Sequence, residues 1–185
     1  MITTQSNAEN RSKRRMGPGA HAKCIFTSGE IKETAKGTKF IELWFASQSG
    51  ETQKKAIFFP TGTPTPKEGE SLAEAKEREI NAFTGACFDT LIAFYDPQDS
   101  IISGDSVDSF AKKFLDKLKT AKGFCNLMVQ YTTDYKYTEF PKYDWIEKYQ
   151  ENSPVTLRVS DSLRLTKKGE RNENSGNAPG PGRSF

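Results

Sequence analysis

The chain has 185 residues, of which 35% are hydrophobic and 28% are charged, and its formal net charge is +3. This length suits one domain that buries its core without disulfides or metals, and no segment approaches the roughly 20 consecutive apolar residues of a membrane-spanning helix. The first residues also lack the apolar region of a secretory signal. Because the three cysteines are odd in number and far apart, we expect buried free thiols in the reducing environment of a cytoplasm.

Positive charge is concentrated at the two ends of the chain. Residues 1–23 carry five basic side chains and one acidic one, and residues 158–185 carry six basic and three acidic ones. Residues 24–157 instead carry 16 basic and 20 acidic side chains. Basic ends approach phosphate backbones favourably because they release counterions, yet many such ends are simply solvated. The charge distribution alone leaves both interpretations open.

The polar composition of the two ends sets the predicted domain boundaries. Residues 1–20 end in Gly-Pro-Gly and contain little that would form a core, so we predict a disordered basic arm. Residues 168–185 are rich in glycine, proline and asparagine, which predicts a flexible tail. The folded domain is therefore predicted to span residues 21–167.

A meander of three strands is predicted at the start of this domain. Segments 24–34, 38–47 and 53–59 have the composition of strands, and glycine-containing turns separate them. Pro60, which cannot donate to a strand ladder, ends the third segment.

The second of these segments divides into two faces. Side chains alternate across a strand, so Ile41, Leu43 and Phe45 share one face and are expected to fill the core. Phe40 and Trp44 lie on the opposite face and point outward. Trp44 is then either exposed to a ligand or covered by a helix.

Two amphipathic helices are predicted next. Apolar residues recur at helical spacing over residues 71–94, and an Asp-Pro pair ends this segment. A second helix begins after Ser106 or Asp105, either of which is a suitable cap, and ends at residues 119–123 with positive charge and a glycine. Both apolar stripes indicate packing against the core rather than a ligand pocket.

Strands return after the helices. Segments 124–133 and 135–141 are predicted strands joined by a short turn, an aromatic segment spans residues 142–147, and a last strand is predicted at 155–159. This order predicts a mainly β protein with a helical insertion, of the α+β class. We expect an OB-type five-stranded β-barrel with two helices between strands 3 and 4.

Residues suited to catalysis or metal binding are scarce. His21, the only histidine, lies at the edge of the predicted arm, and the sequence contains no Cys-x-x-Cys pair or glycine-rich phosphate loop. We therefore expect no enzymatic activity, no metal and no cofactor. The alternative, a metal-dependent nuclease, requires three or more aspartates to converge in one cleft. The candidates are Asp89, Asp105, Asp108, Asp134 and Asp144.

Aromatic and basic side chains coincide on the same predicted hairpins. Unstacked bases lie on flat rings, which contribute about 1–3 kcal/mol per base, and lysine or arginine side chains meet the phosphates. This pattern predicts a site for single strands of DNA, although RNA offers the same rings and phosphates and strand lysines also protect sheet edges. The candidate residues are Lys36, Lys39, Phe40, Trp44, Lys54, Lys55, Tyr131, Tyr135, Lys136, Tyr137 and Lys142.

Two segments of the chain resemble a known group of proteins. Residues 29–45, GEIKETAKGTKFIELWF, resemble the first hairpin of phage-encoded single-stranded-DNA-binding proteins and related OB-fold replication proteins. Residues 129–143 resemble the closing hairpin of the same group. The resemblance implies an OB fold, cooperative or oligomeric coating of single strands, and a role in DNA replication or recombination in the host cytoplasm.

The chain departs from that group in two respects. Many of its members end in an acidic tail tipped by an aromatic residue that recruits partners, whereas Phe185 follows Gly-Arg-Ser without an acidic cluster. In those members the tail recruits other replication proteins, and this chain lacks the acidic part of that tail. The helical insertion is also larger than a minimal barrel needs, which makes it a candidate oligomer or partner interface. A second hypothesis is accordingly a non-enzymatic structural or adaptor protein, either a virion component or a replication-complex subunit, on the same barrel.

Overall fold

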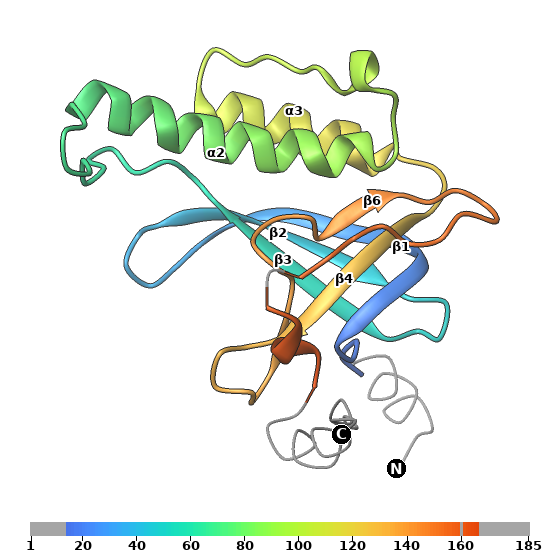
Figure 1. Cartoon of the computed structure of the whole chain (residues 1–185). Coiled ribbons are helices and arrows are strands. Elements are labelled where there is room, and N and C mark those ends of the chain that lie inside the picture. The colour runs from blue at the N-terminus through green and yellow to red at the C-terminus, as the bar shows by residue number, and fades with distance from the viewer. Residues whose placement is uncertain (1–13, 160, 167–185) are drawn as a thin grey trace, which may run out of the picture.

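The computed structural model describes residues 14–159 and 161–166, which contain strands before and after a pair of helices (Figure 1). The strands are β1 (Gly19–Glu33), β2 (Lys39–Ala46), β3 (Thr52–Phe58), β4 (Cys125–Tyr131), β5 (Thr138–Glu139) and β6 (Ile146–Lys148). The α-helices are α2 (Leu72–Ile92) and α3 (Val107–Lys119), and the short 3-10 helices are η1 (Pro97–Ser100) and η2 (Ser162–Leu165). The predicted α+β class and the place of the helices between the third and fourth strands are confirmed.

The strands form one antiparallel sheet in the order β3-β2-β1-β4-β5, with β6 also paired to β4. β1 pairs with two strands: its residues 25–33 pair with β2, and its residues 19–24 pair with β4. The pairing register of β1 shifts between Phe26 and Ser28 against β2, and between His21 and Cys24 against β4. Lys23, in the second of these places, adopts a φ of 56°. Such bulges bend a strand. The bend in β1 joins the two parts of a curled sheet (Figure 1).

Both helices begin at serine caps, and for α3 the cap is Ser106, one of the two candidates predicted from the sequence. The Ser71 side chain accepts a hydrogen bond from the Glu74 backbone, and the Glu74 carboxylate accepts one from the Ser71 backbone, which is a capping box. Ser106 caps α3 by accepting from the backbone of Ser109. The two helices lie on the same side of the sheet (Figure 1), and the rings of Phe83 and Phe110 join them with centres 5.8 Å apart.

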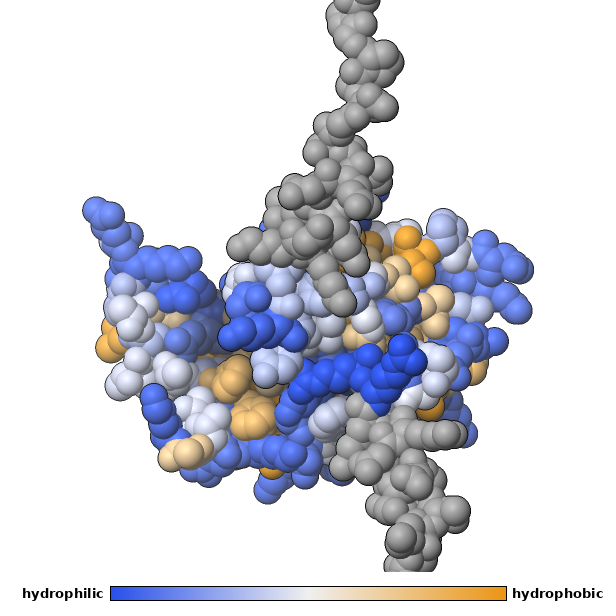
Figure 2. Space-filling model, turned by 90° about the horizontal axis from the view of Figure 1, so that it is seen from below, coloured by the Kyte–Doolittle hydropathy of each residue, from blue (hydrophilic) through white to orange (hydrophobic). Residues whose placement is uncertain are grey.

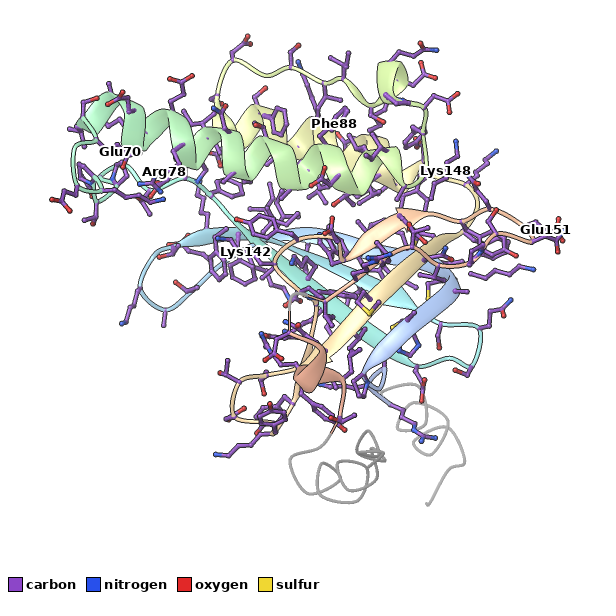
Figure 3. All side chains as sticks on the ribbon, in the orientation of Figure 1. Glu70, Arg78, Phe88, Lys142, Lys148 and Glu151 are labelled. Carbon is purple, nitrogen blue, oxygen red and sulfur yellow. The ribbon has the colours of Figure 1, made fainter. Side chains whose placement is uncertain are left out.

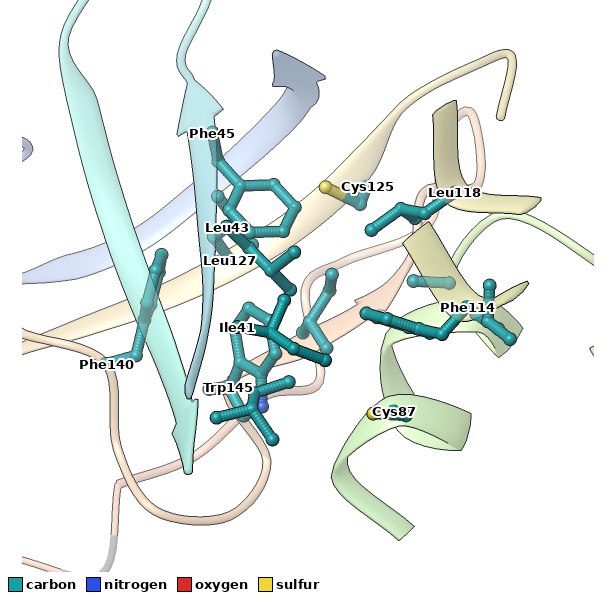
Figure 4. Close-up of a cluster of buried hydrophobic side chains, with 14 of the residues drawn as sticks. Ile41, Leu43, Phe45, Cys87, Phe114, Leu118, Cys125, Leu127, Phe140 and Trp145 are labelled. Atoms are coloured by element: carbon teal, nitrogen blue, oxygen red, sulfur yellow. The ribbon is translucent and has the colours of Figure 1, made fainter. Parts of the chain in front are cut away.

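The core fills the space between the sheet and the helices. Ile41, Leu43 and Phe45 are fully buried, as the alternation in β2 predicts, and in Figure 4 they lie between the strands and α3. Phe114 and Leu118 supply the helical side of this core and are also fully buried. Within the described residues, no helix is both long enough and apolar enough to cross a membrane.

The three cysteines are buried free thiols, in agreement with the sequence. Cys24 and Cys125 face each other across β1 and β4, and Cys87 lies on α2 (Figure 4). Burial raises the pKa of the Cys24 thiol to about 12, and it also raises the pKa values of the other two thiols. Thiols in this state are unreactive packing groups.

The end of the domain differs from the prediction. Residues 155–159 form no strand, so that prediction is wrong; the last strand is β6, in the aromatic segment. Thr156 is instead held by its backbone and hydroxyl, which both donate to the Glu147 carboxylate of β6. The predicted strand at 135–141 shortens to β5, because residues 132–137 form a turn in which Thr132 and Asp134 accept backbone hydrogen bonds.

The folded part of the chain also begins earlier than the predicted boundary at residue 21. Met16 is fully buried, its backbone donates to Thr52, and the Thr52 backbone donates to Arg14. Residues 14–20 therefore lie against β3 and in β1 rather than in a disordered arm. Residues 1–13 and 167–185, which include the whole of the tail predicted at 168–185, lie outside the described residues.

Candidate nucleic-acid interface

The side of β1, β2 and β3 that points away from the core carries both aromatic and basic side chains. We call this surface, formed by Ser28, Glu30, Lys32, Phe40, Glu42, Trp44, Lys54, Ala56 and Phe58, the outer face. Cross-strand partners share a face of an antiparallel pair. Trp44 therefore lies between Ser28 and Lys54, and Phe40 lies between Lys32 and Phe58.

Trp44 is partly exposed and held in one orientation. Its indole Nε1 donates to the Glu42 carboxylate at 3.0 Å, and the Lys54 Nζ lies 5.5 Å from the ring centre. The backbone oxygen of Trp44 accepts from the Thr27 hydroxyl at 3.0 Å. Because the helices pack on the opposite side of the sheet, they do not cover this indole (Figure 1). A ring fixed in this way beside a cation is suited to stacking with a nucleobase.

Glu42 organises the centre of the outer face. Its carboxylate is almost fully buried and bonds the Nζ atoms of Lys32 at 2.6 Å and Lys54 at 2.8 Å. Burial opposes ionisation of this carboxyl group, but the hydrogen bonds from Lys32, Lys54 and Trp44 outweigh that effect and lower its pKa to about 2. The carboxylate thus fixes both lysines and the indole at once, while each lysine keeps close to half of its side chain exposed.

Glu42→Gln is expected to lower the free energy of unfolding at pH 7 by about 1–3 kcal/mol, because two lysines lose their shared carboxylate. The folded-state pKa of Glu42 lies below its ordinary value of 4.5. Its contribution is therefore complete above pH 4.5 and declines as the pH falls toward about 2. Urea unfolding at pH 7 and pH 3 measures this, with a smaller difference between wild type and variant at pH 3.

Glu30→Gln is the matched control for this prediction. Glu30 pairs with the same Lys32 Nζ at 2.8 Å, but its side chain is 60% exposed. Exposed ion pairs contribute little, so this variant is expected to change stability by less than about 0.5 kcal/mol at either pH. A Glu42→Gln difference that is equal at pH 7 and pH 3 would contradict the role given to the ionised carboxylate.

The loop between β4 and β5 extends the outer face at the end where Lys54 lies. Tyr137 is 60% exposed, and the Arg15 guanidinium lies 5.7 Å from its ring centre. Arg15, Lys54 and Tyr137 line one cleft of about 290 Å³, together with Gln53 and other residues of β3 and β5. The cleft brings a second exposed ring and a second cation close to the Trp44–Lys54 pair. Seen from below, the surface in Figure 2 is mostly hydrophilic with small separate hydrophobic areas.

Other predicted residues of the turns and loops occupy separate places. Lys36 is exposed in the turn between β1 and β2, whereas Lys39 points toward the helices and pairs with Asp108 of α3 at 2.7 Å. The rings of Tyr131 and Tyr135 lie 6.1 Å apart, and Lys136 is exposed beside them in the same loop.

Lys55 and Lys142 do not lie on the outer face. Successive residues of a strand point to opposite sides, so Lys55 faces away from Lys54. Its Nζ donates to the Pro141 carbonyl at 2.9 Å and lies 5.0 Å from the Trp145 ring centre. Burial lowers the pKa of Lys55 to about 8. Lys142 lies beside the strands, below the helices, in Figure 3, with its Nζ 5.0 Å from the Tyr143 ring centre.

Three residues of the outer face and the adjoining cleft are absent from the set of candidates predicted from the sequence. Phe58 is 55% exposed and its ring centre lies 5.4 Å from that of Phe40; its even spacing from Lys54 would have placed it on the outer face. Lys32 is opposite Phe40 by register, which requires knowledge of the pairing. Arg15 counted in the sequence only as one of the five basic side chains of residues 1–23, because it lies within the segment predicted to be an arm.

The aspartates that would build a nuclease site are mostly apart. Burial and then the charge of Asp144 raise the pKa of Asp89, so these two lie near each other. Asp108 forms an ion pair with Lys39, and the Asp134 carboxylate accepts a hydrogen bond from the Lys136 backbone within its own turn. Among the residues that the structure describes, no group of three or more His, Cys, Asp or Glu side chains is arranged to hold a metal ion.

Comparison with protein-family models and with curated proteins finds no match to this chain.

Proposed function

We propose that this protein binds single-stranded DNA on its outer face, with little sequence preference. The observation that carries the proposal is the partly exposed Trp44 indole, which Glu42 fixes in place and Lys54 flanks. Stacking tolerates every base because each base has a flat face. Lys32, Lys54 and the nearby Arg15 supply cations for the phosphates on either side of the stacked base.

The position of this surface on the sheet supports the same proposal. We propose that the curled sheet is an OB-type five-stranded barrel, in which β1 pairs with both β2 and β4. The remaining edges approach each other, since the Gln53 Nε2 of β3 donates to the Thr138 hydroxyl of β5 at 3.3 Å. In OB barrels, oligonucleotides bind to strands 2 and 3 and to the loops after strands 1 and 4. On this proposal, the outer face and Tyr137 correspond to those positions.

The resemblance of the two hairpins to phage single-stranded-DNA-binding proteins supports a role in DNA replication or recombination, in the cytoplasm of a host cell.

The preference for DNA over RNA needs its own measurement, because both nucleic acids offer bases for stacking and phosphates for ionic contact. Comparing the affinities for oligo(dT) and oligo(U) of the same length measures this preference directly.

A structural or adaptor role is the second candidate, and one feature of the helical layer favours it. Phe88 of α2 and Ile101 are 38% and 73% exposed and line an apolar cavity of about 290 Å³ with Leu91 and Phe110. Exposed apolar clusters of this kind mark protein interaction sites. In this alternative, an apolar side chain of a replication or virion protein, or of a second copy of this chain, fills the cavity.

Anisotropy of a labelled oligo(dT) of about 20 nucleotides, measured at two salt concentrations, tests the proposed function. We expect saturable binding that weakens with salt at a log–log slope of about −0.7 for each phosphate contacted. No change in anisotropy at low salt would exclude single-strand binding and leave the adaptor role as the better account.

A further inference from the structure

A groove on the other side of β3 lies between that strand, α2 and the segment 141–145. We call it the α2 groove; its volume is about 700 Å³. β3 supplies Lys55 and Phe58, α2 supplies Arg78, Ala82 and Asp89, and the segment before β6 supplies Lys142, Tyr143 and Trp145. In Figure 3, Lys142 lies beside the strands, below the helices, and Arg78 lies near the N-terminal end of α2.

Phe58 connects the α2 groove to the outer face. It stands at the end of β3, packs against the Phe40 ring on the outer face and also lines the groove. Tyr143, on the opposite wall, is 66% exposed. The groove thus carries two exposed rings, and one of them belongs to the surface on which Trp44 lies.

The basic side chains of the α2 groove favour binding of a polyanion along the wall to which Lys142 belongs. Four basic side chains line the groove against two acidic ones. Arg78 is occupied by the Glu70 carboxylate and Lys55 by the Pro141 carbonyl. Lys142 makes no ion pair within the described part of the chain; its Nζ lies 5.0 Å from the Tyr143 ring centre.

The pair formed by Lys142 and Tyr143 repeats the arrangement of Lys54 and Trp44. In each pair a lysine Nζ lies 5.0–5.5 Å from the centre of an aromatic ring that is at least partly exposed. The acidic residues of the groove, Glu79 and Asp89, both stand on α2. Phosphates are therefore favoured on the Lys142 side and disfavoured against the helix.

We propose that a DNA strand on the outer face continues past Phe58 into the α2 groove, where a base stacks on Tyr143 and a phosphate meets Lys142. This inference rests on the proposed function, because it extends the same binding path. On this inference, Tyr143 and Lys142 form a second stacking site. A DNA strand that is too short to extend beyond the outer face does not reach this site. OB folds bind about 4–16 nucleotides, a range wide enough for a path of two sites.

The affinity for oligo(dT) of about 4 and about 16 nucleotides separates the two sites. We expect Tyr143→Ala to weaken binding of the long oligonucleotide by roughly 5- to 150-fold and to leave the short one unchanged. Lys142→Gln is expected to act in the same direction with a smaller loss. Phe124→Ala is the matched control, since Phe124 is also an exposed ring beside a lysine, with the Lys23 Nζ 5.1 Å from its centre, but lies outside β2, β3 and the groove.

The outcomes distinguish this inference from the proposed function. If the wild type binds both oligonucleotides and Tyr143→Ala binds the long one as tightly as the wild type does, the path through the groove is overturned. Binding on the outer face then still stands. An equal loss at both lengths also overturns it, because Tyr143 would then belong to the first site. Absence of wild-type binding at every length contradicts the proposed function and the path together. Circular dichroism of each variant confirms that the fold is retained.

Discussion

Replacing Trp44 by alanine is expected to weaken oligo(dT) binding by roughly 5- to 150-fold, the equivalent of about 1–3 kcal/mol. Trp44 is the ring of the outer face that is most firmly oriented, through its hydrogen bond to Glu42 and its contact with Lys54. Removing it takes away a stacking platform without disturbing the core, because its neighbours Leu43 and Phe45 face the other way. Fluorescence anisotropy of a labelled oligonucleotide measures the change.

Two further variants identify the origin of this loss. Lys54→Gln removes one charge and is expected to weaken binding less than Trp44→Ala, and also to reduce the salt dependence. Phe124→Ala, away from the outer face, is expected to leave the affinity unchanged. Equal losses for Trp44→Ala and Lys54→Gln would count against base stacking and favour a purely electrostatic contact.

Phe45→Ala is expected to destabilise the protein by about 3–5 kcal/mol, which is a large part of the stability of a domain of this size. Phe45 is fully buried and its ring centre lies 5.8, 6.0 and 5.7 Å from those of Phe26, Phe140 and Trp145. Truncation leaves a cavity where β2 meets the segment before β6. Urea unfolding followed by circular dichroism measures the loss.

Phe58→Ala is the control for this effect. Phe58 belongs to the same β2–β3 pair but is 55% exposed, so its truncation is expected to lower stability by about 1 kcal/mol or less. It is expected to weaken binding, because Phe58 lies on the outer face. Equal destabilisation by the two variants would contradict the assignment of inner and outer sides of β2 and β3.

The regular elements followed from local sequence patterns. Alternation predicted that Ile41 and Phe45 are buried on the side of β2 opposite Trp44, and apolar periodicity predicted both helices, with Ser106 as one of two candidate caps for α3. These features depend on neighbours within a few residues. The strand predicted at 155–159 is absent because a strand requires a partner strand, and the Thr156 backbone donates to the Glu147 carboxylate instead.

The candidate site was only partly predictable for the same reason. Trp44 and Lys54 follow from alternation along single strands. The approach of Arg15 to Tyr137 joins segments more than 100 residues apart, and the α2 groove combines β3, a helix and the segment before β6. Lys54 and Lys55 were predicted as members of one site, whereas the two-residue period of a strand places their side chains on opposite sides of β3.

Intrinsic tryptophan fluorescence during titration with unlabelled oligo(dT) tests the central claim most directly. The chain has two tryptophans, of which Trp44 lies on the outer face and Trp145 is only 3% exposed and lines the α2 groove. The titration therefore uses an oligo(dT) of about 4 nucleotides, which is too short to reach the groove and contacts Trp44 alone. We predict saturable quenching that weakens at higher salt and is lost in Trp44→Phe, although that variant still binds in the anisotropy assay. A flat titration of the wild type at low salt would contradict base stacking on Trp44 and, with it, the proposed function.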